Sequence, residues 1–348
     1  MIMREKNPEN LEFPFPELDS FVTPNERFFV RNHFEAPELK METWKLRVEG
    51  TVNTPIELTF GDLIAISSRK LTAMLECSGN GRVFLQPKAK GLQWEQGGVS
   101  NAEWVGVPLA AVLDRAGIGA GAVEVILEGA DCGEVTEDPR SPGPIHFARS
   151  LPLSKAIQPD VILAYEMNGE PLSQSHGFPL RAIVPGWYGM CSIKWLTRIV
   201  VTDEPFNGYY QSIEYSYFRE VAGIPTLTAA TEMEVKSQIA RPTYREIVPK
   251  SSSYRIHGAA WSGEGQVVRV EVSADAGETW ADATLMGESH TYTWRLWEYE
   301  WLTPTQPGPC ILMARATDDR GRVQPVARDK ARRSYMISHV VPLEVEVR

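Results

Sequence analysis

The residues best suited to chemistry lie together in the segment Leu75–Arg82, which reads Leu-Glu-Cys-Ser-Gly-Asn-Gly-Arg. The thiol of Cys77 follows a run of apolar residues and precedes a turn in which Gly79 and Gly81 permit a left-handed backbone. A guanidinium such as that of Arg82 favours the thiolate form of a neighbouring cysteine, which is the form that binds metals. Residue chemistry alone leaves two interpretations of Cys77, a functional thiol or a small buried hydrophobic residue.

Several common catalytic motifs are absent. The sequence has no GKS or GKT for phosphate, no HExxH for zinc and no GxSxG for a nucleophilic serine. Gly117, Gly119 and Ala122 resemble a dinucleotide fingerprint, but they follow a predicted helix and precede a predicted strand. That order is the reverse of what the motif requires, so we interpret these residues as a turn.

Composition and charge exclude further classes of protein. At roughly 150 residues per domain, 348 residues suggest two domains, and 43% hydrophobic and 23% charged residues are ordinary globular values. The chain has 35 Lys and Arg against 45 Asp and Glu, a net charge of −10, which argues against binding nucleic acid or acidic membranes. A small anionic ligand must therefore be attracted by a local cluster of basic side chains.

The cysteines and the N-terminus predict a cytoplasmic protein. The 4 cysteines are too sparse for a disulfide scaffold and form no CxxC pair. No apolar run reaches the roughly 18 residues of a membrane-spanning helix. The first residues lack the basic start and apolar middle of a secretory signal. We expect reduced thiols and no membrane segment.

The elements that must position Cys77 divide the chain into three parts. Residues 1–25 carry four prolines and predict an extended arm over the surface. Residues 26–215 predict a mixed α+β domain with long functional loops. Residues 216–348 predict a domain of short strands, and the prolines of residues 203–250 predict a linker and crossover between the two domains.

Periodicity gives the elements of the mixed domain. Thr59 to Ser67 predicts a short helix with Thr59 as N-cap and Asp62 at the third position. Pro108 to Gly117 predicts a helix whose apolar residues share one face. The predicted strands are Trp44–Glu49, Val123–Glu128, Val161–Tyr165, Arg181–Val184 and Trp195–Val201.

From about residue 251 onward, every readable segment is typical of a strand. Val268, Val270 and Val272 alternate with polar residues and predict one buried face. Ile311–Thr317 and Val340–Val347 predict further strands. Short strands separated by turn signals over about 100 residues predict a β-sandwich.

The chain also resembles the sulfite oxidase family of molybdenum enzymes, in which the residue corresponding to Cys77 lies in a loop of the CAGN type. The resemblance continues in order along nearly the whole chain. It is carried by the segments Phe28–His33, Lys90–Trp94, Leu163–Gly169, His176–Arg181, Lys194–Trp195, Ala260–Gly263 and Val268–Trp280. The fold that it implies is α+β, a mixed α/β molybdopterin-binding domain followed by an immunoglobulin-like β-sandwich through which the chain forms a homodimer.

The cofactor that the resemblance implies is molybdopterin carrying molybdenum. High-valent molybdenum is bound well by soft sulfur, here two sulfurs of the pterin and the thiolate of Cys77. The residues that match cofactor contacts of the family are Arg31, Asn32, His33, Cys77, Asp131, His176, Arg181, Ser192 and Lys194. Without the resemblance, the residues themselves favour a surface charge for Arg181 and a turn residue for His176.

A second set of residues matches the family's catalytic positions. These are Cys77, Arg31, Arg82, Trp94 and Arg333. Several guanidinium groups at one cavity repel one another unless an anion neutralises them, so the set suits a small anionic substrate. Trp94 alone is equally well interpreted as a core aromatic residue.

Two departures from the family concern the substrate. Phe147 aligns with the active-site tyrosine of the family and cannot donate the hydrogen bond of its hydroxyl. Either the neighbouring His146 takes its place, or the substrate or the turnover differs. Gly81 stands where animal enzymes often have arginine, which removes a positive charge. Both departures put sulfite in question and leave the cofactor unaffected.

The implied reaction is transfer of an oxygen atom to sulfite or a related sulfur oxyanion. The chain has no room for a heme or flavin module, so we expect electrons to leave to a separate acceptor. One alternative is a reductase of the same fold acting on nitrate, an S-oxide or another oxyanion. The others are a cofactor-free binding protein built on the immunoglobulin-like module and a redox-sensing role for Cys77.

Overall fold

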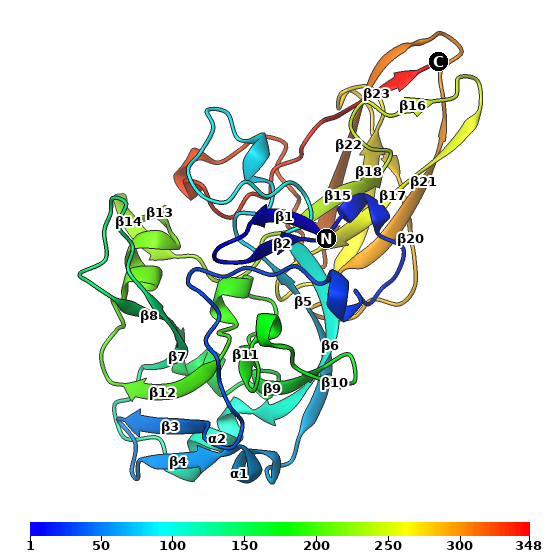
Figure 1. Ribbon diagram of the computed structural model, residues 1–348. Coiled ribbons are helices and arrows are strands. Elements are labelled where there is room, and N and C mark those ends of the chain that lie inside the picture. The colour runs from blue at the N-terminus through cyan, green and yellow to red at the C-terminus, as the bar shows by residue number, and fades with distance from the viewer.

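Two five-stranded sheets form the larger part of the molecule in the computed structural model, which covers residues 1–348 (Figure 1). In the first sheet, every pair of strands is antiparallel. It consists of β5 (Arg69–Glu76), β6 (Val99–Pro108), β9 (Ile162–Met167), β10 (Glu170–Pro171) and β11 (Arg181–Ile183), in the order β10-β9-β6-β5 with β11 paired to β9.

The second sheet is mixed, because β12 runs parallel to β3 and antiparallel to β7. It consists of β3 (Lys45–Gly50), β4 (Ile56–Thr59), β7 (Glu124–Gly133), β8 (Ile145–Pro152) and β12 (Leu196–Thr202), in the order β4-β3-β12-β7-β8. The five strands predicted for this domain are all present, with ends shifted by at most five residues, and they fall in both sheets.

The helices are short and follow directly from local sequence. They are α1 (Phe60–Ile64), α2 (Leu109–Ala116) and α3 (Leu153–Ala156). Thr59 and Asp62 form the predicted capping box at α1, but this helix ends three residues earlier than expected. In α2 the predicted apolar face is buried, and Gly117, with a φ of 69°, ends the helix.

Single helical turns complete the loops around the sheets. The 3₁₀ turns are η1 (Phe15–Glu17), η2 (Asn25–Arg27), η3 (Arg82–Phe84), η4 (Gln174–His176), η5 (Gly189–Cys191) and η7 (Lys330–Arg332). The remaining turn, η6 (Tyr210–Glu214), is a π-helix. No helix combines the length and the apolar composition that crossing a bilayer requires.

Two further sheets form the C-terminal β-sandwich, at the upper right of Figure 1. One consists of β15 (Lys236–Arg241), β17 (Ser253–Trp261), β20 (Thr284–Leu285) and β21 (Arg295–Leu302). The other consists of β16 (Ile247–Val248), β18 (Val267–Ser273), β19 (Ala281–Asp282), β22 (Gly308–Asp318) and β23 (Leu343–Val347). Fifteen buried residues from both sheets form one core between them, so the predicted α+β fold with a β-sandwich is confirmed.

One valine of the sandwich points the other way from our prediction. A register shift lies between Val267 and Arg269 where β18 pairs with β22. The irregularity turns Val267 into the core and leaves Val268 53% exposed, whereas Val270 and Val272 are buried as predicted.

Two proline-rich segments are more structured than expected. Within residues 1–25, β1 (Ile2–Glu5) and β2 (Asn10–Glu12) form a hairpin, and Phe13 and Phe15 are buried. The predicted linker of residues 203–250 holds η6, the hairpin of β13 (Ser216–Val221) and β14 (Ile224–Ala229), and the first two strands of the sandwich. Prolines mark turns between strands here rather than an unstructured connection. The N-terminal hairpin lies near the junction of the two parts (Figure 1).

Candidate active site

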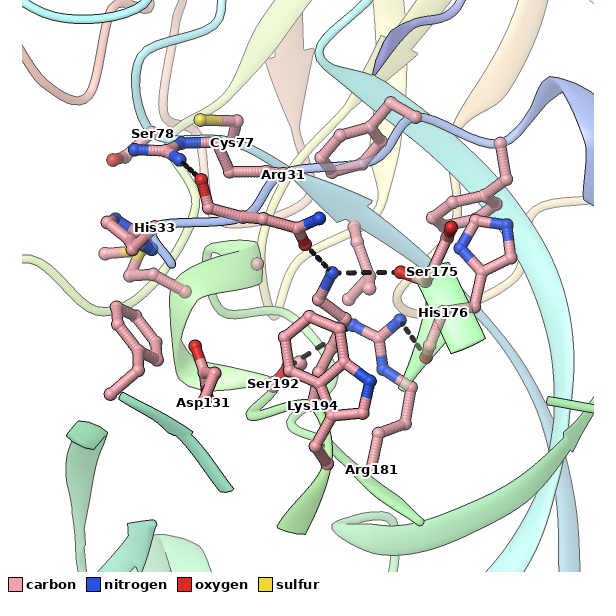
Figure 2. A pocket seen from close by; sticks show the side chains of 18 of the residues that line it. Arg31, His33, Cys77, Ser78, Asp131, Ser175, His176, Arg181, Ser192 and Lys194 are labelled. Atoms are coloured by element: carbon pink, nitrogen blue, oxygen red, sulfur yellow. Dashed lines mark hydrogen bonds between the residues drawn. The ribbon is translucent and has the colours of Figure 1, made fainter. Parts of the chain in front are cut away.

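An inner cavity of about 670 Å³ gathers residues that are far apart in the sequence. Its lining comes from the N-terminal segment, the strand ends of both sheets of the larger domain, and the segment after η6. All nine residues predicted to bind the cofactor line it: Arg31, Asn32, His33, Cys77, Asp131, His176, Arg181, Ser192 and Lys194. Figure 2 shows Cys77 and Arg31 near one edge of the pocket and Arg181 and Lys194 near the opposite edge.

Cys77 is presented by a tight turn directly after β5. Its backbone N–H donates to the carbonyl of Gly98 at 2.8 Å, and its carbonyl accepts from the N–H of Asn80 at 2.8 Å. Gly81 ends the turn with a φ of 96°, a conformation that glycine adopts without strain. Cys77 is 7% exposed and lines the cavity, so its thiol is reached through the cavity.

At the opposite edge, Arg181 is a buried cation without a carboxylate partner. Its Nη1 donates to the carbonyl of His176 at 3.0 Å and its Nη2 to that of Ser192 at 3.3 Å, while Nε has no partner. Burial lowers the pKa of Arg181 to about 9 and that of His176 to about 4. The cavity wall is therefore short of negative charge at this edge.

Lys194 continues this basic wall. Its Nζ donates to the carbonyl of Ser175 at 2.9 Å and to the side-chain oxygen of Asn32, and it lies 4.2 Å from the centre of the Trp195 ring. Burial, and then the nearby Arg181, hold the pKa of Lys194 well below its usual range. The single acidic residue of the lining is Asp131, whose pKa burial raises to about 7.

An aromatic group closes the side of the cavity next to Arg31. The hydroxyl of Tyr215 lies 2.6 Å from Nε2 of His33, and the His33 ring stacks on Phe147 with centres 4.4 Å apart. Burial lowers the pKa of His33 and raises that of Tyr215. Both groups are therefore uncharged near neutral pH and share one neutral hydrogen bond.

A larger outer cavity of about 2180 Å³ adjoins the inner cavity. The two cavities share Arg31, Asn32 and His33, so they meet at these residues. Arg333, predicted to be catalytic, lines the outer cavity. Its guanidinium donates to the hydroxyl of Ser216 at 2.9 Å, and its backbone has a φ of 58° and a ψ of −121°. Such sparsely populated conformations are kept where the surrounding structure enforces them, often at functional sites.

Two of the predicted catalytic residues line neither cavity. Arg82 is buried and donates to the carbonyls of Leu92 at 2.8 Å and Ser334 at 3.2 Å. Trp94 is fully buried and packs edge-on against Phe29 with ring centres 6.2 Å apart. Both lie beside the loop of Cys77 and hold it against neighbouring segments, so contact with a substrate would require a rearrangement.

A tyrosine hydroxyl is present at the site, although not at the position of Phe147. Phe147 does line the inner cavity, but Tyr215 brings a hydroxyl into it from the segment after η6. Tyr215 lies within the predicted linker of residues 203–250, so the sequence pattern does not single it out. The pair Tyr209-Tyr210 followed by Tyr215 was the available signal, since aromatic clusters are uncommon in solvated linkers.

Two family models match the chain. Residues 33–210 match the family model described as the oxidoreductase molybdopterin binding domain, and residues 228–340 match the Mo-co oxidoreductase dimerisation domain. The chain belongs to the sulfite oxidase family of molybdopterin oxidoreductases. It is thus a molybdopterin-dependent enzyme. The predicted domain limits at residues 25 and 215 stay predictions.

Individual members of the sulfite oxidase family resemble most of the chain. Mitochondrial sulfite oxidase of Homo sapiens is 36% identical over 342 residues, which cover 93% of this chain and 61% of that protein. Nitrate reductase [NADH] 1 of Arabidopsis thaliana is 35% identical over 79% of this chain and 32% of its own length. The chain therefore spans about three fifths of the sulfite oxidases and one third of the nitrate reductase.

A solved structure of similar fold is that of the sulfane dehydrogenase SoxCD from Paracoccus pantotrophus. It has a TM-score of 0.84 and 29% sequence identity, covering 98% of this chain and 85% of that one. The likeness extends over both the larger domain and the sandwich.

The inner cavity fits the molybdopterin of the sulfite oxidase family. The Nε of Arg181 and the hydroxyl of Ser78 are buried polar atoms without partners in its wall. The side chains of Arg31, Arg181 and Lys194 and two histidines face a single carboxylate there, so the cavity is complementary to an anionic ligand such as a pterin phosphate. No three His, Cys, Asp or Glu side chains come together as a metal site of their own, and Cys77 contributes the only thiol of the cavity lining.

Proposed function

We propose that this chain transfers an oxygen atom to sulfite or a related sulfur oxyanion and passes the electrons to a separate acceptor. The observation that carries the proposal is the shared cavity of the Cys77 thiol, the Arg31 guanidinium and the Tyr215 hydroxyl. Bound molybdopterin supplies the oxygen-atom and two-electron chemistry, which no side chain of the protein performs. The protein contributes binding, orientation and charge.

In this proposal, two edges of the inner cavity have different tasks. Cys77 supplies the thiolate that binds the metal, and the turn from Cys77 to Asn80 fixes its direction. Arg181 and Lys194 bind the phosphate of the pterin, which neutralises cations that are otherwise costly to bury. His33, Asn32, Asp131, His176 and Ser192 surround the pterin.

The substrate reaches the site through the outer cavity. Arg31 lies where the two cavities meet, so its guanidinium binds the anion at the entrance to the inner cavity. Arg333, on the outer wall, attracts it from solvent. His33 and Tyr215, both uncharged, orient the anion by hydrogen bonding without adding repulsive negative charge.

The assembly belongs to the same proposal. The match of residues 228–340 to a dimerisation domain supports a homodimer. The electron acceptor is a separate protein, and the enzyme acts in the cytoplasm.

Substrate choice is tested by rapid mixing of the oxidised holoenzyme with sulfite, and of the reduced holoenzyme with nitrate and an S-oxide. We expect sulfite to reduce the enzyme and the other compounds to leave it reduced. Reoxidation by nitrate without any reaction with sulfite would instead favour the reductase, an alternative that similarity to nitrate reductase keeps open.

An arginine variant makes the same test specific to the site. Arg31→Gln removes a charged hydrogen-bond donor to the substrate. The loss of about 1.5–3 kcal/mol of binding free energy should raise the KM for sulfite by about 10–100-fold. The control is Arg140→Gln, whose side chain is 70% exposed and lines neither cavity. An equal KM in the wild type and both variants contradicts the assignment of Arg31.

A further inference from the structure

A buried polar cluster joins the residue before Cys77 to the C-terminal β-sandwich. Glu76 is 2% exposed. Its Oε1 accepts from Nζ of Lys236 at 2.9 Å, and its Oε2 accepts from Nε1 of Trp261 at 3.0 Å. Lys236 is itself 3% exposed, so both charges are withdrawn from water.

Lys236 and Trp261 are a single cross-strand pair. Lys236 begins β15, Trp261 ends β17, and the two residues lie directly opposite each other in the antiparallel register. One rung of the sandwich therefore holds both oxygens of the Glu76 carboxylate, which fixes the plane of that carboxylate as well as its position.

The same ammonium group also contacts the far end of the cysteine turn. Nζ of Lys236 donates to the carbonyl of Asn80 at 3.1 Å, and the side-chain amide of Asn80 donates to Oε1 of Glu76 at 3.2 Å. The N–H of Asn80 donates in turn to the carbonyl of Cys77 at 2.8 Å. Lys236 thus bridges the residue before Cys77 and the residue three positions after it.

Stability is a weak explanation for this cluster. The desolvation of two buried charges offsets most of their attraction, and apolar replacements of such pairs are often as stable. Groups that orient a metal ligand through hydrogen bonds, by contrast, commonly change metal affinity or activity by about 10–100-fold when they are removed.

We propose that Glu76, Lys236 and Trp261 are positioning residues that hold the Cys77 thiol in place from the C-terminal domain. The sandwich then has a second task besides dimerisation, because one rung of it sets the geometry of the metal-binding turn. The inference rests on the proposed function, in which Cys77 is the metal ligand.

A matched pair of variants tests this role. Lys236→Met removes the ammonium and keeps the length of the side chain. Lys155→Met does the same at a second interdomain pair outside both cavities, where Nζ of Lys155 lies 2.7 Å from Oε1 of Glu264, which also accepts from Trp187. The readouts are the electron paramagnetic resonance spectrum of chemically generated Mo(V) and steady-state kinetics of the holoenzyme.

We expect Lys236→Met to shift the Mo(V) spectrum and to lower kcat by about 10–100-fold with little change in KM. Lys155→Met should keep the wild-type spectrum and kcat. If Lys236→Met does not fold, Trp261→Phe removes the donor to Oε2 together with part of a buried ring, keeps Lys236, and should shift the spectrum in the same way.

The outcomes separate the two proposals. A wild-type Mo(V) spectrum and kcat in Lys236→Met, or in Trp261→Phe where that variant replaces it, overturns the positioning role and leaves the proposed function intact. Equal losses in Lys155→Met and Lys236→Met also overturn it, because both then reflect the stability of the domain junction. A wild-type chain without any Mo(V) spectrum contradicts the proposed function and this inference with it.

Discussion

Tyr215 and His33 share a hydrogen bond of 2.6 Å at the junction of the two cavities. Burial holds both groups in their neutral forms, because it raises the pKa of the phenol and lowers that of the imidazole. A neutral donor at this point orients an incoming anion, and its proton remains available for exchange with the imidazole.

Tyr215→Phe should therefore lower kcat/KM for sulfite by about tenfold, the effect of losing a hydrogen bond worth about 1–1.5 kcal/mol. The ring and its packing on Tyr335, with centres 5.0 Å apart, are retained. Tyr209→Phe is the control, because the Tyr209 hydroxyl bonds only to the carbonyl of Pro139 in the outer cavity. Unchanged kinetics in Tyr215→Phe would exclude the hydroxyl from substrate binding.

His176 predicts a dependence of stability on pH. Its Nε2 lies 3.0 Å from the carbonyl of Asn25, and burial lowers its pKa from 6.5 to about 4. The folded state therefore resists protonation. Its stability contribution is complete above about pH 6.5 and is lost as the pH falls toward 4.

The expected loss over this range is about 3 kcal/mol in the free energy of unfolding. It should be measured by chemical denaturation of the cofactor-free chain, comparing wild type with His176→Gln, whose amide can still donate to Asn25. As the pH falls from 6.5 to 4, the free energy of unfolding should decline less in the variant than in the wild type. Parallel curves would mean that His176 is not buried in its neutral form.

At the scale of elements, η4 and β11 bring the basic residues to the cavity, and Gly177 sets their spacing. It follows η4 with a φ of 105°, and a Cβ there would lie 3.0 Å from Cβ of Lys194 and 3.1 Å from Cβ of Arg181. Only glycine allows both the backbone conformation and this close approach.

Gly177→Ala should reduce the pterin content of the purified protein, because Arg181 and Lys194 must move apart. Gly169→Ala is a matched control, since Gly169 also has a positive φ, of 81°, but a Cβ there meets nothing within 4 Å. Pterin released by denaturation can be measured by fluorescence. Equally reduced pterin content in both variants would show that backbone strain, and not the approach of Arg181 and Lys194, determines pterin binding.

Sequence predicted those elements whose cause is local. The capping box at Thr59 and the apolar face of α2 depend on residues within two helical turns, so periodicity found both. The π-helix η6 and the β13-β14 hairpin were missed because prolines were interpreted as signals of a linker. The register irregularity that turns Val268 outward depends on pairing with residues of β22 that lie about fifty positions away in the sequence.

At the scale of the whole molecule, the site is assembled from residues between Phe28 and Tyr215. Its cofactor-binding residues were predicted from ordered resemblance, because each motif could be matched on its own. The sequence does not predict the role of Tyr215 or the contacts of Lys236. These arise only when the predicted linker and the sandwich fold back onto the cysteine turn. The cytoplasmic location stays a prediction.

The assembly should be a dimer in solution. The matched dimerisation domain supports a particle of about twice 38.9 kDa, measured by light scattering after gel filtration. The mass should be unchanged in Lys155→Met and in Lys236→Met, since both side chains are buried within one chain. A monomer at micromolar concentration would contradict the homodimer.

The proposed function depends most on the bond between the Cys77 thiol and molybdenum. Molybdenum X-ray absorption of the purified holoenzyme tests it by counting the sulfur atoms bound to the metal in the wild type and in Cys77→Ser. We expect molybdenum in both proteins, with one sulfur atom fewer bound to the metal in the variant. The same sulfur count in both, or a wild type without molybdenum when the host is supplied with the metal, would contradict it.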